Sequence, residues 1–340
     1  MSARRARAVR GTGNSLVDSA PRVLITGSSG YVGRLLLAEL ASRVARGEMG
    51  AVIGTDVREP GELPPGALFE RLDVRDAALA DVLRRHGITC VVHLASIVTP
   101  GKRSSRAFEY DVDVNGTRNV LAACVAAGVR RLIVTSSGAA YGYHADNPAW
   151  LTEEHPVRGT EAFAYSWHKK LVEDMLAQAR REHPALEQVV FRVGTILGAS
   201  VNNQITALFE KRRLLAIRGS SSPFVFMHDG DLVACLAQAV SSPVTGVFNA
   251  AGDGAMTIDD IAAVLGTPVV RLPAWLLRAT LAVLHPLGLT RYGPAQVDFL
   301  RYRPVLDNTR LKRVFGFTPR LTSRQTFDLW MRHRDRGERS

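Results

Sequence analysis

Hydrophobic and polar positions alternate in two ways along the chain up to about residue 198. Short apolar runs, typical of buried strands, lie at 22–27, 51–56, 89–95, 131–137 and 187–197. Stretches with apolar residues at helical spacing lie between them, at 31–47, 114–129 and 165–182. Because strands and helices alternate, the pattern predicts a parallel sheet with helices on both faces.

The pattern changes beyond residue 198. Residues 246–253 still have the composition of a strand at a sheet edge, but Gly and Pro interrupt the helical pieces around them. We therefore expect an α/β fold with a doubly wound parallel sheet and a smaller, mostly helical C-terminal region that covers a cleft. A chain of 340 residues is long enough for one large domain with a smaller one appended.

The segment TGSSGYVGRLL joins the first expected strand to the first expected helix and contains three glycines. Gly27 can adopt the tight turn, Gly30 leaves room for a pyrophosphate, and Gly33 lets the helix pack closely on the strand. The helix start offers free N–H groups and a positive dipole end to phosphates. The segment therefore predicts a dinucleotide-binding turn of the Rossmann type. The other residues of this segment that we expect to line the cofactor are Ser29, Tyr31 and Val32.

The second expected strand ends in Asp56. A carboxylate at this position can accept hydrogen bonds from the ribose hydroxyls of the cofactor and repels a 2′-phosphate, so NAD is predicted over NADP. Arg58 lies two residues further on, and an arginine there can accommodate the 2′-phosphate. NADP therefore stays open as the alternative.

Tyr165 and Lys169 are four residues apart in an expected helix and share one of its faces. An ammonium group beside a phenol favours the phenolate, and such a pair can take or return a hydroxyl proton while hydride moves to a nicotinamide. The expected strand 131–137 ends in Thr135, Ser136 and Ser137. A hydroxyl at a strand's carboxyl end lies in the ligand crevice of such a sheet, where it can bond the substrate oxygen.

Several motifs occur in the order typical of the extended short-chain dehydrogenase/reductase family, which the chain resembles over most of its length. They are Thr26-Gly27-x-x-Gly30-x-x-Gly33, Asp56, LDV at 72–74, VVHLA at 91–95, Asn115, TSSGAAYG at 135–142, Tyr165-x-x-x-Lys169, Arg192, FVFMHDGDLVACL at 224–236 and DNTRLKRVFGFTPRLT at 307–322. Within this superfamily the chain is similar to NAD-dependent epimerases and dehydratases of the UDP-sugar 4-epimerase type.

The resemblance implies a role for each matched position. The glycines would hold the pyrophosphate of NAD and Asp56 its adenosine ribose, while the residues implied around the rest of the cofactor are Asp73, Val74, Leu94, Ala95, Tyr165 and Lys169. Ser137 would be the catalytic hydroxyl, Tyr165 the base and Lys169 its partner. Asn115 would be a structural helix position near the site, and pairing through two helices of each subunit would make a homodimer.

This interpretation divides the chain into regions. Residues 1–20 would be a disordered basic tail, and 21–198 the NAD-binding Rossmann domain, to which 224–253 return. Residues 199–330 would mostly form the substrate-binding or lid region, and 331–340 a second basic tail.

The departures from the family's motifs bear on the reaction. Dehydratases have an Asp-Glu pair after the catalytic hydroxyl, whereas this chain has Gly138 and Ala139, so dehydration is disfavoured. Epimerases have an arginine that clamps the substrate diphosphate where this chain has Phe224. The basic residues that could replace it are Lys211, Arg212, Arg213, Arg218, Arg301 and Arg303. An apolar pocket could instead form from Phe224, Phe226, Trp275 and Leu276.

Three hypotheses follow. The first is a nucleotide-sugar epimerase that retains NAD while it oxidises and then reduces its substrate. The second is a net dehydrogenase of an apolar secondary alcohol, similar to 3β-hydroxysteroid dehydrogenases. The third is a non-catalytic NAD-binding module, against which the presence of both Tyr165 and Lys169 argues.

Composition narrows the choice of partners and compartment. The net charge is +11, but part of it lies in the two arginine-rich ends, and no basic run is interleaved with aromatic residues, so nucleic acid is not an expected partner. No stretch is a convincing membrane span, and the three cysteines fit a reducing cytoplasm. We expect no metal, because His93 and His168 lack ligand partners at usable spacing. His228 clusters with Asp229 and Asp231, but the resemblance implies that this cluster is a capped helix start.

Overall fold

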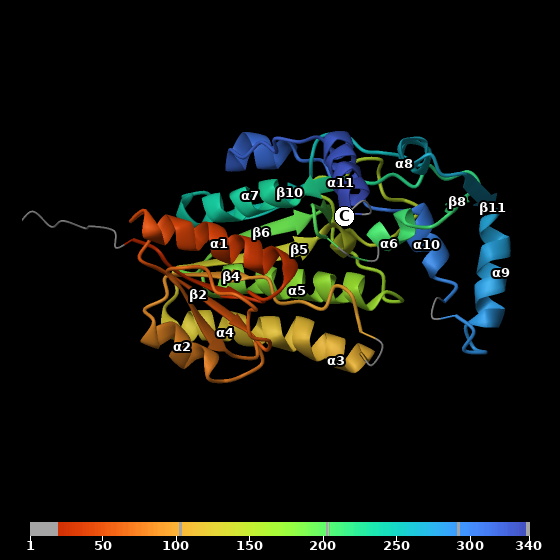
Figure 1. Cartoon of the computed structure of the whole chain (residues 1–340). Coiled ribbons are helices and arrows are strands. Elements are labelled where there is room, and N and C mark those ends of the chain that lie inside the picture. The colour runs from red at the N-terminus through yellow and green to blue at the C-terminus, as the bar shows by residue number, and fades with distance from the viewer. Residues whose placement is uncertain (1–19, 102–103, 202, 204, 291–292, 338–340) are drawn as a thin grey trace, which may run out of the picture.

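The computed structural model describes residues 20–101, 104–201, 203, 205–290 and 293–337. A seven-stranded sheet with strand order β10-β6-β5-β4-β1-β2-β3 lies at its centre, and all neighbouring strands in it are parallel. The expected Rossmann-type α/β fold with a helical C-terminal region is confirmed (Figure 1). Residues 1–19 of the expected basic tail lie outside the described residues.

The elements have the following bounds. The strands are β1 (Arg22–Thr26), β2 (Ala51–Asp56), β3 (Ala67–Arg71), β4 (Cys90–His93), β5 (Arg131–Ser137), β6 (Glu187–Val193), β7 (Thr195–Leu197), β8 (Leu214–Ile217), β9 (Phe226–His228), β10 (Gly246–Ala250) and β11 (Val269–Leu272). The α-helices are α1 (Tyr31–Ala45), α2 (Leu79–Arg85), α3 (Arg106–Tyr110), α4 (Gly116–Ala127), α5 (Ala164–Glu182), α6 (Thr206–Phe209), α7 (Asp229–Ser241), α8 (Ile258–Leu265), α9 (Ala274–Leu284), α10 (Gln296–Arg301) and α11 (Ser323–Gly337). The π-helices η1 (Asp111–Asn115) and η3 (Leu311–Phe315) and the 3₁₀ helix η2 (Gly138–Tyr141) complete them.

Helices cover both faces of the sheet (Figure 1). Helices α1 and α7 pack over one face, where Leu36 and Leu236 belong to one buried apolar cluster. Helices α2, α4 and α5 pack over the other face, where Val120 and Leu176 belong to a second cluster. Strands β1, β2 and β4 lie between the two clusters, so both faces of these strands are buried and their sequences are almost continuously apolar.

The expected strand 187–197 is two strands. Strand β6 ends before Gly194, whose N–H donates to the carbonyl of Ala250 at 2.9 Å, and β7 then pairs with β9 outside the main sheet. A Cβ at Gly194 would lie only 3.2 Å from the Val225 side chain. The chain therefore leaves the sheet at Gly194, where it turns toward the C-terminal region.

The chain later returns to the sheet through β10, which pairs with β6 at the edge. An aromatic core fills the C-terminal region, with ring contacts between Phe209, Phe226, Phe327 and Trp330. Residues 331–337, within the segment expected to be a basic tail, are the last turns of α11. Among the described residues, every helix is too short or too polar to traverse a bilayer.

A buried ion pair joins α5 to the sheet. The guanidinium of Arg192 on β6 bonds the Glu173 carboxylate at 2.7 Å, and both side chains are less than 10% exposed. Ser136 on β5 donates to the same carboxylate at 2.5 Å, and Arg192 donates to the Tyr141 hydroxyl at 2.7 Å. Burial lowers the pKa of Arg192, but the Glu173 carboxylate outweighs it and the pKa is raised overall.

We expect Glu173→Gln to lower the free energy of unfolding by about 3 kcal/mol, because it leaves the Arg192 charge buried without its counter-ion. The matched control is Asp174→Asn, the next residue of α5, whose ion pair with Lys170 is at the surface. Its loss should stay within about 0.5 kcal/mol. Urea unfolding measures the free energy of unfolding of both variants. Equal losses in the two variants would contradict the stabilising role of the Arg192–Glu173 ion pair.

Candidate active site

The glycine turn between β1 and α1 has the geometry that its sequence predicted. Gly27 has a φ of +71°, and a Cβ there would lie 2.7 Å from the backbone nitrogen of Ala95. A Cβ at Gly33 would overlap the carbonyl oxygen of Gly27, so the helix can approach the turn only without one. At Gly30 a Cβ would meet only that carbonyl, at 3.1 Å, and open space otherwise. The turn therefore leaves a concave backbone surface at Gly30.

Helix α1 begins at this surface with its N–H groups available. No side chain caps its first turn, and no acidic residue lies in that turn. The Asp56 carboxylate at the end of β2 accepts from the Ser29 N–H at 3.2 Å and from the Arg58 N–H at 3.0 Å. Backbone N–H groups, a helix dipole and a nearby carboxylate thus meet at one place, and they fit the phosphates and ribose of a dinucleotide.

Tyr31 and Val32 are the first two residues of α1. The Tyr31 hydroxyl donates to Asp229 at the start of α7, at 2.5 Å. Burial, together with this carboxylate, raises the pKa of Tyr31 to about 12, so the phenol stays protonated. Val32 packs against the apolar cluster under α1. Their side chains stabilise the fold, and their N–H groups belong to the first turn of α1.

Leu94 and Ala95 lie against the same turn. The Leu94 N–H donates to the Thr26 carbonyl at 3.2 Å, and the Ala95 N–H donates to the Thr26 hydroxyl at 3.4 Å. The Thr26 hydroxyl in turn bonds His93 Nδ1 at 2.7 Å. The end of β4 and the turn after β1 are therefore held together through one threonine.

The hydrogen bonds assign the tautomer of His93. The Thr117 hydroxyl donates to the Asp113 carbonyl at 2.6 Å, so it can only accept from His93 Nε2, at 2.9 Å. His93 Nδ1 then accepts from Thr26. Burial, with a smaller contribution from Lys169, lowers the pKa of His93 to about 3. His93 is a neutral residue that orients Thr26.

Asp73 and Val74 lie on the loop after β3. The hydrogen bonds described around the glycine turn do not involve them. Asp73 forms an ion pair with Arg75 at 2.7 Å, which lowers the pKa of the carboxyl group. Val74 packs against Gly116, where a Cβ would lie 2.7 Å from the valine Cγ2. Their implied place in an adenine pocket stays a prediction.

Two hydrogen bonds dock the start of α5 at the carboxyl end of β5. Lys169 donates through Nζ to the Thr135 carbonyl at 3.0 Å, and the Ser166 hydroxyl donates to the Ala139 carbonyl at 2.6 Å. The Lys169 ammonium also lies 5.6 Å from the centre of the Tyr165 ring. Ser137 ends β5 and accepts from the Ala139 N–H at 3.1 Å. The structure thus brings Tyr165, Lys169 and the turn after Ser137 together.

Asp113 connects this group with the segment after β4 that lies against the glycine turn, and the sequence did not reveal it. Its buried carboxylate accepts from the Ile97 N–H at 2.8 Å and bonds His168 Nδ1 at 3.1 Å. Ile97 follows the Leu94–Ala95 segment, and His168 lies between Tyr165 and Lys169 on α5. A carboxylate in a helix interior was the available signal, but it does not reveal its distant partners. Asn115, the position singled out instead, bonds its neighbours Asp111 and Arg118.

The apolar pocket considered for Phe224, Phe226, Trp275 and Leu276 is not formed. Phe224 and Phe226 are buried and stack at 5.8 Å, whereas Trp275 is 71% exposed on α9. The guanidinium of Arg303 lies 3.9 Å from the Phe224 ring centre and 4.3 Å from that of Phe299. Its Nε has no hydrogen-bond partner, and among the described residues no acidic side chain pairs with it. Burial lowers the pKa of Arg303 to about 9, so it remains charged at neutral pH.

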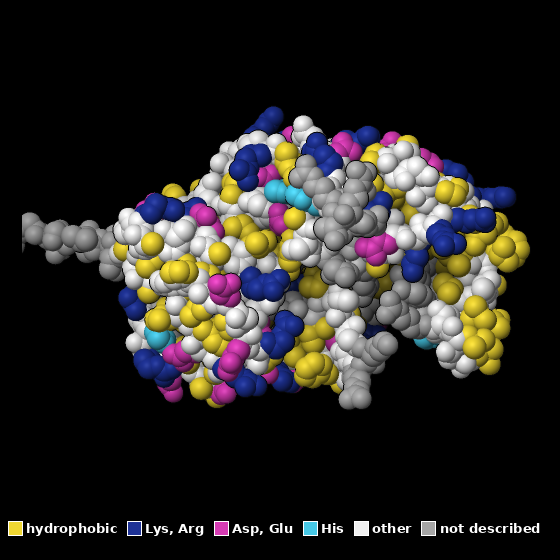
Figure 2. Space-filling view, in the orientation of Figure 1, with side chains coloured by type: hydrophobic (Ala, Val, Ile, Leu, Met, Phe, Trp, Pro, Cys, Tyr) yellow, Lys and Arg dark blue, Asp and Glu magenta, His cyan; other side chains and the backbone are white. Residues whose placement is uncertain are grey.

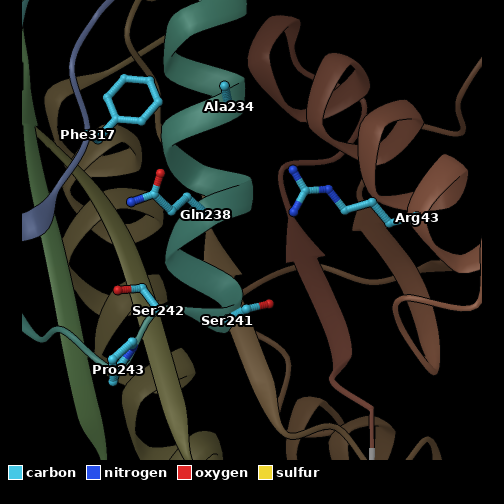
Figure 3. A pocket seen from close by; sticks show the side chains of 7 residues that line it. All are labelled: Arg43, Ala234, Gln238, Ser241, Ser242, Pro243 and Phe317. Atoms are coloured by element: carbon cyan, nitrogen blue, oxygen red, sulfur yellow. The ribbon is translucent and has the colours of Figure 1, made fainter.

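One surface pocket, of about 620 Å³, lies elsewhere. Figure 3 shows Arg43 of α1 and Gln238 of α7 on its two sides. Ser242, another lining residue, accepts through its carbonyl from Arg131 at the start of β5. The pocket therefore lies toward the amino ends of the strands, away from Tyr165. Within the part of the chain that the structure describes, no group of residues could hold a metal ion.

Comparison with known proteins agrees with this geometry. The sequence profile of the NAD dependent epimerase/dehydratase family matches residues 23–251. An uncharacterized protein of Mycobacterium tuberculosis is 25% identical over 320 residues, which cover 92% of this chain and 84% of that protein. The UDP-glucose 4-epimerase of Mus musculus is 30% identical over 199 residues, or 54% of this chain and 56% of that enzyme. The solved structure of MoeE5 with UDP-glucuronic acid and NAD has a TM-score of 0.70 and 22% identity, and the match covers 93% of this chain and 99% of that one.

We expect Asp113→Ala to expose the Ile97 amide to hydrogen exchange, at least about tenfold faster than in the wild type, because a charge-assisted hydrogen bond is lost. Asp113→Asn should keep most of the protection, since its amide oxygen can still accept. The control is Asp111→Ala on the same π-helix, where the carboxylate is exposed and pairs with Arg75. Mass spectrometry of peptides that contain Ile97 reads the result. An unchanged exchange rate of the Ile97 amide in Asp113→Ala would refute its hydrogen bond with Asp113.

Proposed function

The chain belongs to the NAD dependent epimerase/dehydratase family, and we propose that it is a nucleotide-sugar epimerase with a Ser137–Tyr165–Lys169 site. The observation that carries this proposal is the docking of Tyr165 and Lys169 at the carboxyl end of β5, where Lys169 bonds the Thr135 carbonyl. Ligands of such sheets bind beyond the carboxyl ends of the strands. Tyr165 would then be a proton-transfer group next to the place where a substrate would lie.

The residues around the glycine turn would hold NAD. The N–H groups at the start of α1 would bind the pyrophosphate, with Gly30 as the point of closest approach. The Ser29 and Arg58 N–H groups orient the Asp56 carboxylate. It would bind the ribose hydroxyls, and its charge would repel a 2′-phosphate. Leu94 and Ala95 would flank the cofactor, since both lie against Gly27.

The reaction follows from the groups at α5. NAD, when bound, would supply the acceptor and donor of a hydride for the oxidation and re-reduction of a secondary alcohol. Tyr165, as phenolate, would take the hydroxyl proton of the substrate and give it back in the reverse step. The Lys169 ammonium near its ring would stabilise the phenolate. Ser137 would donate a hydrogen bond to the substrate oxygen. If the ketone turns over between the two steps, the alcohol returns with inverted configuration.

Arg303 supports a substrate with a diphosphate. Its guanidinium is stacked between two phenylalanine rings and pairs with no acidic side chain among the described residues. Arg303 is partly buried, and a charge partly removed from water without a counter-ion is unfavourable. An anionic ligand would supply that counter-ion. Phe224 occupies the position where the epimerases have their clamping arginine, so Arg303 would supply the missing cation from above this ring.

A second candidate is a net dehydrogenase of an apolar secondary alcohol. The rings of Tyr143, Phe163 and Phe299 contact one another, at 5.1 to 5.7 Å between centres, close to Arg303. An aromatic surface of this kind also suits an apolar substrate. Such an enzyme would release its reduced cofactor, whereas an epimerase would retain NAD. Dehydration stays disfavoured, because η2 has Gly138 and Ala139 where acidic catalysts would be needed.

The purified protein, denatured without added cofactor, should release nearly stoichiometric NAD. Chromatography identifies the nucleotide. An empty protein that binds NAD reversibly would favour the dehydrogenase, and a preference for NADP would contradict the assignment of Asp56.

Tyr165→Phe should lower the turnover of UDP-hexoses by about 10²-fold or more, because the proton acceptor is lost. NAD content should be unchanged. Tyr110→Phe is a suitable control, since the Tyr110 ring contacts His168 from α3 without lying on α5. Undiminished turnover in Tyr165→Phe would refute the catalytic assignment.

Arg303→Met should weaken the binding of UDP about tenfold or more, because a charge-assisted contact to the diphosphate is lost. Titration calorimetry measures the affinity. Arg324→Met on α11 serves as control, since that arginine pairs with Asp328 at the surface. If the wild-type protein itself does not bind UDP, the nucleotide-sugar proposal fails.

A further inference from the structure

Helix α9 exposes an apolar surface that the proposed reaction does not use. Every residue of α9 except Arg278 and Thr280 is apolar, yet none is buried. Trp275 is 71% exposed and Val283 is 61% exposed. The turn after the helix continues the surface, with Leu287 at 64% and Leu289 at 70%. Exposed apolar residues clustered in one short segment mark an interaction site more often than scattered ones do.

This surface lies at the outer end of the molecule. Figure 1 shows α9 at the edge farthest from α1 and α2, beyond the pair β8–β11. The helix is fastened to α10 by the ion pair of Arg278 with Asp298, at 2.7 Å. Residues 274–289 therefore form an exposed ridge at this end of the molecule.

Basic side chains flank β8, the strand that pairs with β11 just before the ridge. Lys211, Arg212 and Arg213 precede β8, Arg218 follows it, and all four are exposed. Strand β8 pairs with β11, and the Arg218 N–H donates to the carbonyl of Leu272, two residues before α9. Among the described residues, no acidic side chain forms an ion pair with these four. Figure 2 shows basic side chains next to hydrophobic ones at this end of the molecule.

The acidic groups nearby are mostly neutralised. Asp259 pairs with Arg271 of β11, and Asp298 pairs with Arg278. Glu210 is the acidic residue directly before Lys211 and is also exposed. The ridge and its surroundings thus keep a net positive charge.

We propose that α9, its following turn and the basic residues at β8 form a docking surface for an anionic lipid bilayer. The helix would lie in the plane of the interface with Trp275, Val283, Leu287 and Leu289 among the lipid headgroups and upper chains. Lys211, Arg212, Arg213 and Arg218 would face the anionic headgroups.

Charge and shape favour a bilayer over other partners. Two copies of this chain would bring two positive surfaces together, which opposes association. A convex, protruding helix suits insertion into a deformable interface better than a fit to a rigid protein. The chain would then be held at the membrane surface by contact, with no helix crossing it.

Flotation of the full-length protein with vesicles tests the proposal. Vesicles of phosphatidylcholine with phosphatidylglycerol should bind the protein at low salt, and vesicles of phosphatidylcholine alone should bind it at least about tenfold less. The double variant Trp275→Ser/Leu287→Ser should lose at least about tenfold in binding to the anionic vesicles. The triple variant Lys211→Gln/Arg212→Gln/Arg213→Gln should lose the preference for anionic lipid.

The control is Leu68→Ser, which changes an exposed leucine of β3 on another part of the molecule. Its binding should equal that of the wild type. NAD binding shows that each variant is folded. Binding that survives in Trp275→Ser/Leu287→Ser overturns the proposal, because another part of the chain, such as its basic N-terminus, would then be responsible. A dimer in light scattering that this double variant dissociates would assign the surface to a second copy and also overturn it.

Discussion

The buried pairing of Arg192 with Glu173 is the interaction on which the geometry of the candidate site depends. Tyr165, Lys169 and Glu173 follow one another at intervals of four residues, so they form one stripe along α5. The anchored carboxylate of Glu173 fixes the rotation of the helix about its axis. That rotation decides that Lys169 reaches the Thr135 carbonyl, and it keeps the Tyr165 ring 5.6 Å from the Lys169 ammonium. Burying two charges is unfavourable in itself. Here the buried pair fixes the orientation of the helix.

Much of the sheet could be predicted from the sequence, because strands buried on both faces have continuous apolar runs. The runs around β1, β2, β4 and β5 are of this kind. Strand β3 lies at the sheet edge and is half exposed, so its pattern ALFER gives no clear signal. The π-helix η1 could not be predicted, because the helical apolar spacing there does not mark a change to i→i+5 hydrogen bonds.

The candidate site was predictable where its residues follow a local spacing. The glycine turn and the Tyr165–Lys169 pair are of that kind, and their roles remain proposals that the geometry supports. The Asp113–His168 pair was not predictable, because the two residues are 55 positions apart and only the fold brings them together. The position of Arg303 could not be predicted from the sequence either. Its position above Phe224 depends on the path of the chain after α10, which no periodicity encodes.

The return of the chain to its sheet through β10 has a consequence for how such proteins can diverge. The C-terminal region is connected to the sheet at Gly194, where the chain leaves, and again at β10, where it comes back. A single cut therefore cannot separate the two parts, because truncation before β10 would leave β6 as an unpaired, apolar edge. Recombination that exchanged the substrate side for another would need to join the chain at two points at once. Divergence by substitutions and loop insertions is the easier route, and it leaves the sheet intact.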